Sequence, residues 1–271
     1  MKEFFGIGGY QRTPEGYMSW QHLTFVTSLM IIMIALAIVF GKRNNKRTQR
    51  EKNGPLVFCA FAINAVEIFK IVMQCVAASD PMGWLYELPL FLCSIQLIAI
   101  PLAAFSGGKL REAALDFVSV FGVLGAVLGT YAAGQNYACY PVLSIQNVAS
   151  GITHSISGFA ALYIIISGMA SMKKNNISIT YSILTGFCIL AHIANMALDY
   201  NYMFLVRGDG TPYDIIYNLV GGNAILYPLS VVFLFIIYIT VFYWVFNLIR
   251  SKTAKKATAE VESEEKELVT K

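Results

Sequence analysis

Long runs of apolar residues, separated by short polar segments, repeat along the whole chain. Each run has about the length that an α-helix needs to cross the hydrocarbon of a bilayer, roughly 20 residues. Charged residues, Gly, Pro or Asn bound every run. The pattern predicts an all-α protein, a polytopic transmembrane helical bundle of seven spans, with six as the alternative. The spans are expected near residues 18–40, 55–78, 88–105, 115–136, 146–170, 179–199 and 222–249.

The basic residues lie in every second segment between these runs. Sixteen of the 20 Lys and Arg residues fall in segments 41–54, 106–114 and 171–176 and in the tail from Arg250. Cytoplasmic loops carry an excess of Lys and Arg, so these four segments are expected on the cytoplasmic side of the cell membrane. The alternation predicts an N-terminus outside the cell and a C-terminus in the cytoplasm.

Composition supports a membrane bundle and argues against other classes of protein. Hydrophobic residues make up 56% of the chain and charged residues 13%, whereas an average soluble domain is about a quarter charged. The net charge of +4 lies in loops that orient helices, so membrane lipids rather than nucleic acid are the expected partners. The five cysteines have no metal or redox spacing and no nucleotide-binding motif occurs, so no cofactor and no metal are expected. Residues 1–249 are expected to form the bundle, and 250–271 a disordered cytoplasmic tail.

Polar residues inside the apolar runs are the candidate functional residues. An ionisable group in a span costs about 2.5–3.5 kcal/mol on insertion scales, so such groups usually face the bundle interior or a wet cavity. Here they form stripes on single helix faces, and the helical rise places most of them in the outer half of the bundle. A polar pocket is therefore expected there. Its candidate residues are His22, Glu67, Lys70, Cys93, Gln96, Gln146, Asn147, His154, His192, Asn195 and Asp199.

Structural roles would explain several of these positions equally well. Polar stripes in membrane bundles often serve only as hydrogen bonds between helices. Glu67 and Lys70, one turn apart, are expected to pair. The glycines at 122, 125 and 129 share one helix face and are expected to permit close packing. Asp116 is expected to cap or precede its helix, near Lys109 and Arg111.

Five short strings carry a resemblance to a known family. They are QHLTF at 21–25, LPLFLCSIQ at 88–96, GITHSISGF at 151–159, NYMFL at 201–205 and NAILYPL at 223–229. With them the chain resembles the YwaF-type bacterial integral membrane proteins, a group similar to the animal TMEM164 proteins. The resemblance implies a phospholipid acyltransferase that uses a Cys and a His, and it places these roles on Cys93 and His154. The chain departs from the pattern at Phe91, where many bacterial members have a His.

Chemistry gives an independent reason to consider this pair, although other functions fit the same residues. Acyl transfer through a thioester needs a thiolate, which a neighbouring base such as His154 supplies. An oxyanion donor is also required, and Gln96, Gln146 and Asn147 are the candidates. A proton-coupled carrier or a sensor would use buried ionisable groups such as Glu67 and Lys70 equally well. In a structural membrane protein, the stripes would only fix helix packing.

Overall fold

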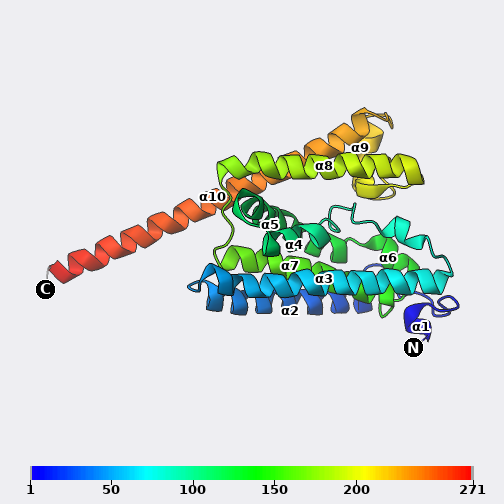
Figure 1. Ribbon diagram of the computed structural model, residues 1–271, viewed down its shortest axis with the longest axis horizontal. Coiled ribbons are helices and arrows are strands. Elements are labelled where there is room, and N and C mark those ends of the chain that lie inside the picture. The colour runs from blue at the N-terminus through cyan, green and yellow to red at the C-terminus, as the bar shows by residue number, and fades with distance from the viewer. Residues whose placement is uncertain (1, 270–271) are drawn as a thin grey trace.

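The protein is an elongated bundle of helices with its two termini at opposite ends (Figure 1). The computed structural model describes residues 2–269, and side chains up to residue 253. No strand occurs among these residues. The helices are α1 (Lys2–Phe5), α2 (Trp20–Asn44), α3 (Gln49–Ala78), η1 (Gly83–Glu87), α4 (Gln96–Phe105), α5 (Gly108–Tyr131), α6 (Gly134–Cys139), α7 (Ile145–Ile166), α8 (Lys174–Leu198), η2 (Tyr202–Phe204), α9 (Tyr213–Leu219) and α10 (Leu226–Val269).

Six helices are long and apolar enough to cross a membrane. They are α2, α3, α5 with its continuation α6, α7, α8 and the part of α10 up to Thr253. This confirms the all-α class and six of the predicted spans. The segment 250–269, expected to be disordered, continues α10 as helix, and its many Ala, Glu and Lys residues have high helix propensity. The side of the membrane on which each loop lies stays a prediction.

The predicted third span, residues 88–105, is helical only in its second half. Helix α4 has 10 residues, about 15 Å of helix, whereas the hydrocarbon of a bilayer is about 30 Å thick. A seventh full-length span is therefore not shown. Pro89 accounts for the extended backbone directly before it, because a proline pushes the preceding residue out of the helical region. Leu88 accordingly has extended backbone, with φ −59° and ψ 148°.

Residues 87–105 nevertheless run antiparallel to α3 along most of its length. Three contacts mark the path, and each involves an earlier residue of α3 than the one before it. Glu87 pairs with Lys70 at 3.1 Å, Asn64 donates to the carbonyl of Leu97 at 3.0 Å, and Asn53 donates to the carbonyl of Ala104 at 2.7 Å. Non-helical backbone at membrane depth is tolerated where it is buried in protein. Segment 88–95 meets this condition by lying against α3 and α5.

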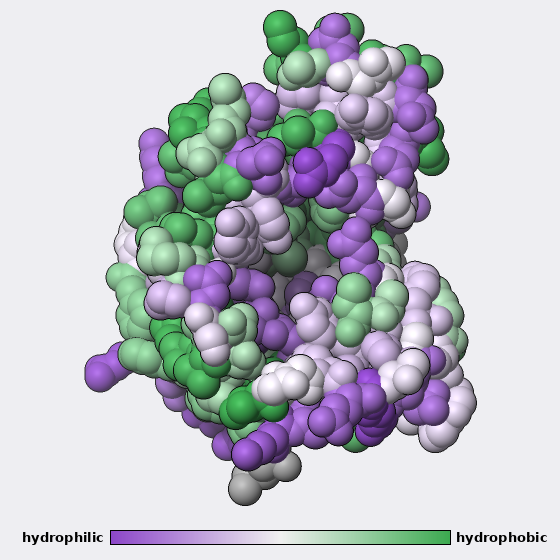
Figure 2. All heavy atoms as spheres, turned by 90° about the vertical axis from the view of Figure 1, so that its right-hand side faces the viewer, coloured by the Kyte–Doolittle hydropathy of each residue, from purple (hydrophilic) through white to green (hydrophobic). Residues whose placement is uncertain are grey.

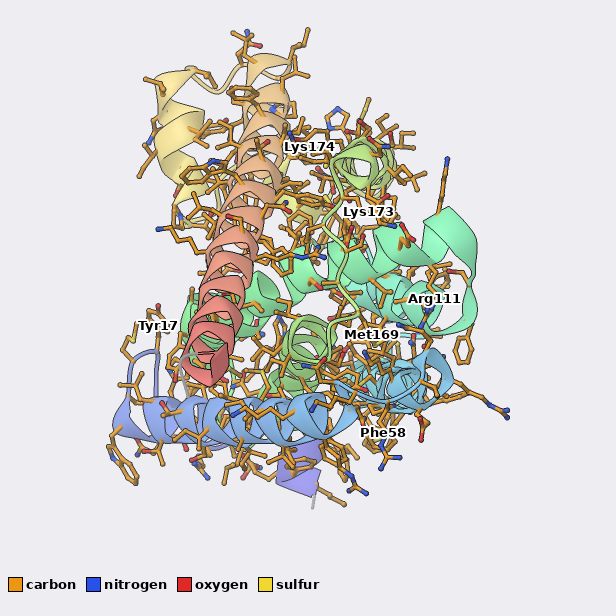
Figure 3. All side chains as sticks on the ribbon, turned by 90° about the vertical axis from the view of Figure 1, so that its left-hand side faces the viewer. Tyr17, Phe58, Arg111, Met169, Lys173 and Lys174 are labelled. Carbon is orange, nitrogen blue, oxygen red and sulfur yellow. The ribbon has the colours of Figure 1, made fainter. Side chains whose placement is uncertain are left out.

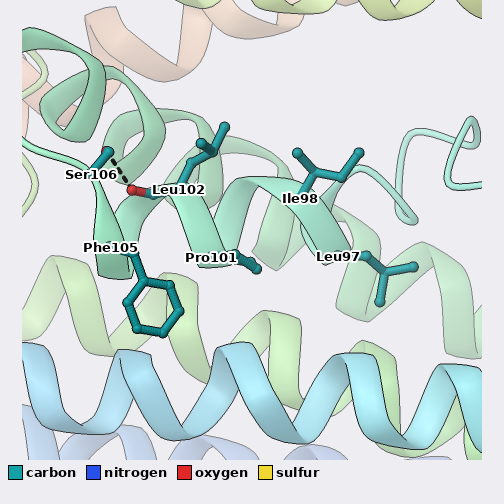
Figure 4. Close-up of a pocket in the computed structure, with 6 residues that line it drawn as sticks. All are labelled: Leu97, Ile98, Pro101, Leu102, Phe105 and Ser106. Atoms are coloured by element: carbon teal, nitrogen blue, oxygen red, sulfur yellow. Dashed lines mark hydrogen bonds between the residues drawn. The ribbon is translucent and has the colours of Figure 1, made fainter.

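Asn64 compensates for a proline inside α4. Pro101 has no N–H, so the carbonyl of Leu97 one turn earlier has no partner within the helix. The side-chain amide of Asn64 supplies that hydrogen bond from α3. Figure 4 shows Leu97 and Pro101 on successive turns of α4. The polar group on α3 therefore fixes the position of a neighbouring helix.

Helix α5 is the centre of the bundle. In its apolar window 67% of the residues are buried, against 22% in α2, α8 and α10. It packs against α4 and α7 on one side and against α8 on the other. In Figure 1, α8, α9 and α10 lie together on the far side of α5 from α2 and α3.

Asp116 connects α5 to the C-terminal helices. The prediction that it lies near a helix start beside basic residues is wrong, because α5 begins at Gly108 and the carboxylate is fully buried. The carboxylate accepts hydrogen bonds from backbone N–H groups in the loop between α7 and α8 and from side chains of that loop, α8 and α10. The donors are Ser171 N at 3.0 Å, Met172 N at 3.0 Å, Ser171 Oγ at 3.0 Å, Asn176 Nδ2 at 3.1 Å and the Tyr243 hydroxyl at 3.3 Å.

Basic side chains gather at the end of the bundle near this carboxylate but do not pair with it. Figure 3 shows that end, with Arg111, Lys173 and Lys174 labelled. Arg111 donates to Asn53 and to the carbonyl of Ala103. Among the described residues, the hydrogen bonds to the Asp116 carboxylate therefore all come from neutral donors.

We expect Asp116→Asn to lower the free energy of unfolding by about 2 kcal/mol, because the new amide N–H₂ group would face donors instead of accepting from them. Thermal unfolding in detergent micelles measures the effect. Asp199→Asn is the matched control: Asp199 is exposed, so its change should stay within about 0.5 kcal/mol. Equal stability of both variants would show that the carboxylate does not hold the C-terminal helices.

Candidate functional site

Cys93 and His154 come together beside α5. Cys93 lies in the non-helical segment before α4, and His154 lies in the middle of α7. Cys93 lies against Gly125 and the His154 ring against Gly129, one turn apart on the same face of α5. Both side chains are half-buried. Two segments that are 61 residues apart in the sequence therefore bring a potential nucleophile next to a potential base.

One hydrogen bond defines the protonation of the His154 ring. Nδ1 lies 2.8 Å from the carbonyl oxygen of Ser150, and because a carbonyl only accepts, Nδ1 carries the hydrogen. In the neutral ring Nε2 is then the acceptor. Nε2 is buried and has no hydrogen-bond partner among the described side chains. The nitrogen that can accept a proton is therefore the one left free.

Glycines of α5 form the wall of this site. A Cβ atom on Gly129 would lie 1.8 Å from Nε2 of His154, and one on Gly125 would lie 3.6 Å from the Cβ of Cys93. A Cβ on Gly122 would lie 2.7 Å from the backbone oxygen of Ser157. The prediction of close packing is confirmed for Gly122. Gly129 also makes room for the His154 ring, a role that the glycine spacing alone did not indicate, whereas a Cβ on Gly125 would make only ordinary van der Waals contact with Cys93.

Glu67 and Lys70 pair as predicted, and a second carboxylate joins them. Lys70 Nζ lies 2.8 Å from Glu67 and 3.1 Å from Glu87. The hydropathy pattern assigns Glu87 to a loop. The only sequence signal for its membership of this site is its position directly before the LPLFLC string.

The same network continues to the end of the bundle that is predicted to face outward. Gln74 Nε2 donates to Glu87 at 3.0 Å and to Gln146 Oε1 at 2.6 Å. These three side chains line a groove of about 340 Å³. Figure 2 looks onto this end of the molecule, where hydrophilic side chains surround a central hollow.

The N-terminal segment forms the opposite wall of that groove. It contributes Phe5, Gly6, Gly9 and Tyr10. The ring of Tyr10 packs edge-on against that of Tyr140, with centroids 5.7 Å apart. The Tyr10 hydroxyl and Gln74 Oε1 are buried and make no hydrogen bond within the described part of the chain. The groove therefore offers both a donor and an acceptor to a polar ligand.

A second groove follows Cys93 along α4 and is apolar. It holds about 460 Å³ and is lined by Leu97, Ile98, Pro101, Leu102, Phe105 and Ser106 (Figure 4). The hydroxyl of Ser106 donates to the carbonyl of Leu102 at 2.5 Å, so it presents no free polar group. Ile98 and Phe105 are exposed. The groove begins four residues after Cys93.

Of the predicted pocket residues, His22 and Asn147 have structural roles instead. His22 is fully buried. Its Nδ1 accepts from Met18 N and its Nε2 donates to the carbonyl of Thr130, both at 3.1 Å. Asn147 uses Nδ2 to donate to the carbonyls of Tyr140 and Pro141. The first side chain ties α2 to α5, and the second fixes the turn into α7.

The predicted pocket residues of α8 do not join the site either. Asn195 bonds the backbone N–H and carbonyl of Tyr202 with its two amide atoms. Asp199 is exposed and caps the C-terminal end of α8. His192 has a buried, unpartnered Nδ1, and within the described residues no hydrogen bond links it to Cys93 or His154. The prediction grouped these residues by their depth along each span, and depth does not indicate which side of the bundle a residue occupies.

Phe91, where the resemblance leads one to expect His, packs into an aromatic cluster. Its ring lies 6.2 Å from that of Tyr200, 5.1 Å from Tyr202 and 6.1 Å from Phe204. This position therefore places no polar group beside Cys93.

Comparison with known proteins identifies one family. The model of the TMEM164 family matches residues 17–252, which include every side chain of the Cys93–His154 site. The match supports the TMEM164 part of the resemblance and not the YwaF name. The chain matches no curated protein and no solved structure.

We expect Gly129→Ala to displace the His154 ring and to lower the free energy of unfolding by about 1–3 kcal/mol, the usual cost of overpacking. The thermal unfolding midpoint of the purified protein measures this. Gly186→Ala, on α8, is the matched control, because a Cβ there meets nothing within 4 Å. If Gly129→Ala unfolded at the same temperature as the control, the glycine would not be what accommodates His154.

Proposed function

Because this chain belongs to the TMEM164 family of multi-pass membrane proteins, we propose that it is a phospholipid acyltransferase with Cys93 as nucleophile and His154 as base. The observation that carries the proposal is the placement of the Cys93 thiol beside an imidazole whose Nε2 is free to accept a proton. A thiol becomes a strong nucleophile when a neighbouring base takes its proton.

The reaction proceeds in two halves. In the first, His154 takes the proton of Cys93, and the thiolate attacks the carbonyl carbon of a phospholipid ester. The ester C–O bond breaks, the leaving alcohol takes the proton from His154, and a thioester remains on Cys93. In the second half, His154 removes the proton of a lysophospholipid hydroxyl, whose oxygen attacks the thioester and releases the thiol. The Ser150 carbonyl keeps the imidazole oriented through both halves.

The two grooves fit the two parts of such a substrate. The groove along α4 has an apolar wall and begins four residues after Cys93, so it suits the acyl chain. The groove lined by Gln74, Glu87 and Gln146 suits the polar headgroup. The substrate is a membrane lipid, and we place the headgroup groove on the outer side of the cell membrane, in accordance with the distribution of basic loops.

One observation favours a second candidate function. Glu67, Lys70 and Glu87 form a continuous set of ionisable groups from the interior to the headgroup groove. Intramembrane ionisable groups of this kind also serve proton-coupled carriers. Proton-driven uptake of a polar solute by liposomes that contain the purified protein would favour the carrier. Such uptake should be lost in Lys70→Met and retained in Cys93→Ala if the carrier function is separate.

We expect Cys93→Ala and His154→Ala to change the acyl-chain profile of cellular phospholipids in the same way as loss of the whole protein, because both halves of the reaction need both groups. Mass spectrometry of lipid extracts measures the profiles. Cys139→Ala, an exposed cysteine of α6, is the matched control and should give the wild-type profile. Wild-type profiles in all variants and in cells without the protein would refute the acyltransferase.

A further inference from the structure

Gln96 is a fully buried amide that has no hydrogen bond. It is the first residue of α4, its side chain is 0% exposed, and neither Nε2 nor Oε1 has a partner among the described residues. An unpartnered polar group in a protein interior costs about 1–3 kcal/mol. A catalytic role is one of the explanations for a buried polar group that is retained at that cost.

The turn that contains Cys93 places Gln96 on the same side. The backbone N–H of Gln96 donates to the carbonyl of Cys93 at 3.3 Å, and the next two N–H groups repeat the same i→i+3 pattern. In such a 3₁₀ turn, side chains three residues apart eclipse each other. The Cys93 side faces Gly125 of α5 and the His154 ring. The free amide therefore shares the face on which the thiol meets its base.

The other two amides considered for the same role lie elsewhere, one in the headgroup groove and one at the start of α7. Gln146 accepts from Gln74 in the headgroup groove. Asn147 donates through Nδ2 to two backbone carbonyls. Of these three residues, only Gln96 keeps an N–H₂ group that is buried and available.

We propose that Gln96 binds the oxyanion that forms when Cys93 is acylated, which rests on the proposed acyltransferase function. When the thiolate sulfur bonds to the ester carbon, the electron pair of the C=O bond moves onto the oxygen. Gln96 Nε2–H donates a hydrogen bond to that negative oxygen. When the carbonyl re-forms, the ester C–O bond breaks, and the leaving oxygen takes the proton held by His154. Gln96 itself exchanges no proton.

A buried environment makes this donor effective. A hydrogen bond to a developing charge is stronger where water is excluded, and a donor already in place needs no reorganisation during the reaction. Removal of one such donor typically lowers the rate of acyl transfer by about 100- to 1,000-fold. If Gln96 served only packing, its replacement by an apolar side chain of similar shape would leave the stability of the protein unchanged or raise it, because the amide is unpaired. Such a replacement would not slow acylation.

The test measures acylation of Cys93 directly. Full-length protein in detergent is mixed with the p-nitrophenyl ester of a fatty acid, and the burst of p-nitrophenol is followed together with the intact mass of the protein. Wild type is compared with Gln96→Met, Gln96→Glu and Cys93→Ala. Gln135→Met is the matched control, since Gln135 is exposed on α6. Thermal unfolding shows whether each variant is folded, and Gln96→Glu, which keeps the shape and polarity, serves if the Met variant is not.

We expect Gln96→Met to unfold at or above the wild-type temperature and to acylate about 100- to 1,000-fold more slowly, while Gln135→Met acylates at the wild-type rate. A folded Gln96 variant that acylates within threefold of wild type would overturn the role of Gln96 and leave the acyltransferase intact. Wild-type protein that gains no acyl group at Cys93 would refute the proposed function, and the role of Gln96 with it.

Discussion

The close approach of α7 to the glycine face of α5 determines where the candidate functional groups lie. Gly122 admits the backbone of α7 at Ser157, and Gly129, two turns along, admits the ring of His154. Because α5 is the central helix, a side chain on this face would push α7 outward. His154 would then move away from the segment that carries Cys93. The juxtaposition of thiol and imidazole thus depends on the absence of a side chain at Gly122 and Gly129.

The polar residues of the bundle fall into two groups according to whether their hydrogen bonds are made. Asn64, Asp116, His22 and Asn195 make hydrogen bonds to other elements of the bundle, and these residues hold the helices together. Gln96, His154 and Gln74 each retain a buried atom with no partner among the described residues. Intramembrane polar groups carry a cost in either group. Where the protein itself does not offset that cost, the lipid substrate of the proposed reaction would offer the partner.

The pattern of apolar runs predicted six of the helices, and the short motifs brought out Cys93 and His154 as the candidate catalytic pair without indicating that they are close in space. It did not predict the break in the third run, since LPLFLCSIQ is as apolar as a helix and only Pro89 signals the extended start. The pattern also did not distinguish the polar residues that hold the helices together from those of the candidate site. His22 meets Thr130, and Asp116 meets Ser171, across 108 and 55 residues. A hydropathy profile contains no information about such pairings.

The burial of Asp116 has a consequence for the order of assembly. The chain elongates from its N-terminus, so α5 enters the membrane before the residues that bond to this carboxylate exist. Asn176 and Tyr243 follow 60 and 127 residues later. Until α8 and α10 have been synthesised, the nascent bundle carries a carboxylate whose own donors are missing. The C-terminal helices therefore complete the environment of a residue made early in translation, and a truncated chain would retain an uncompensated charge by which cellular quality control could recognise it.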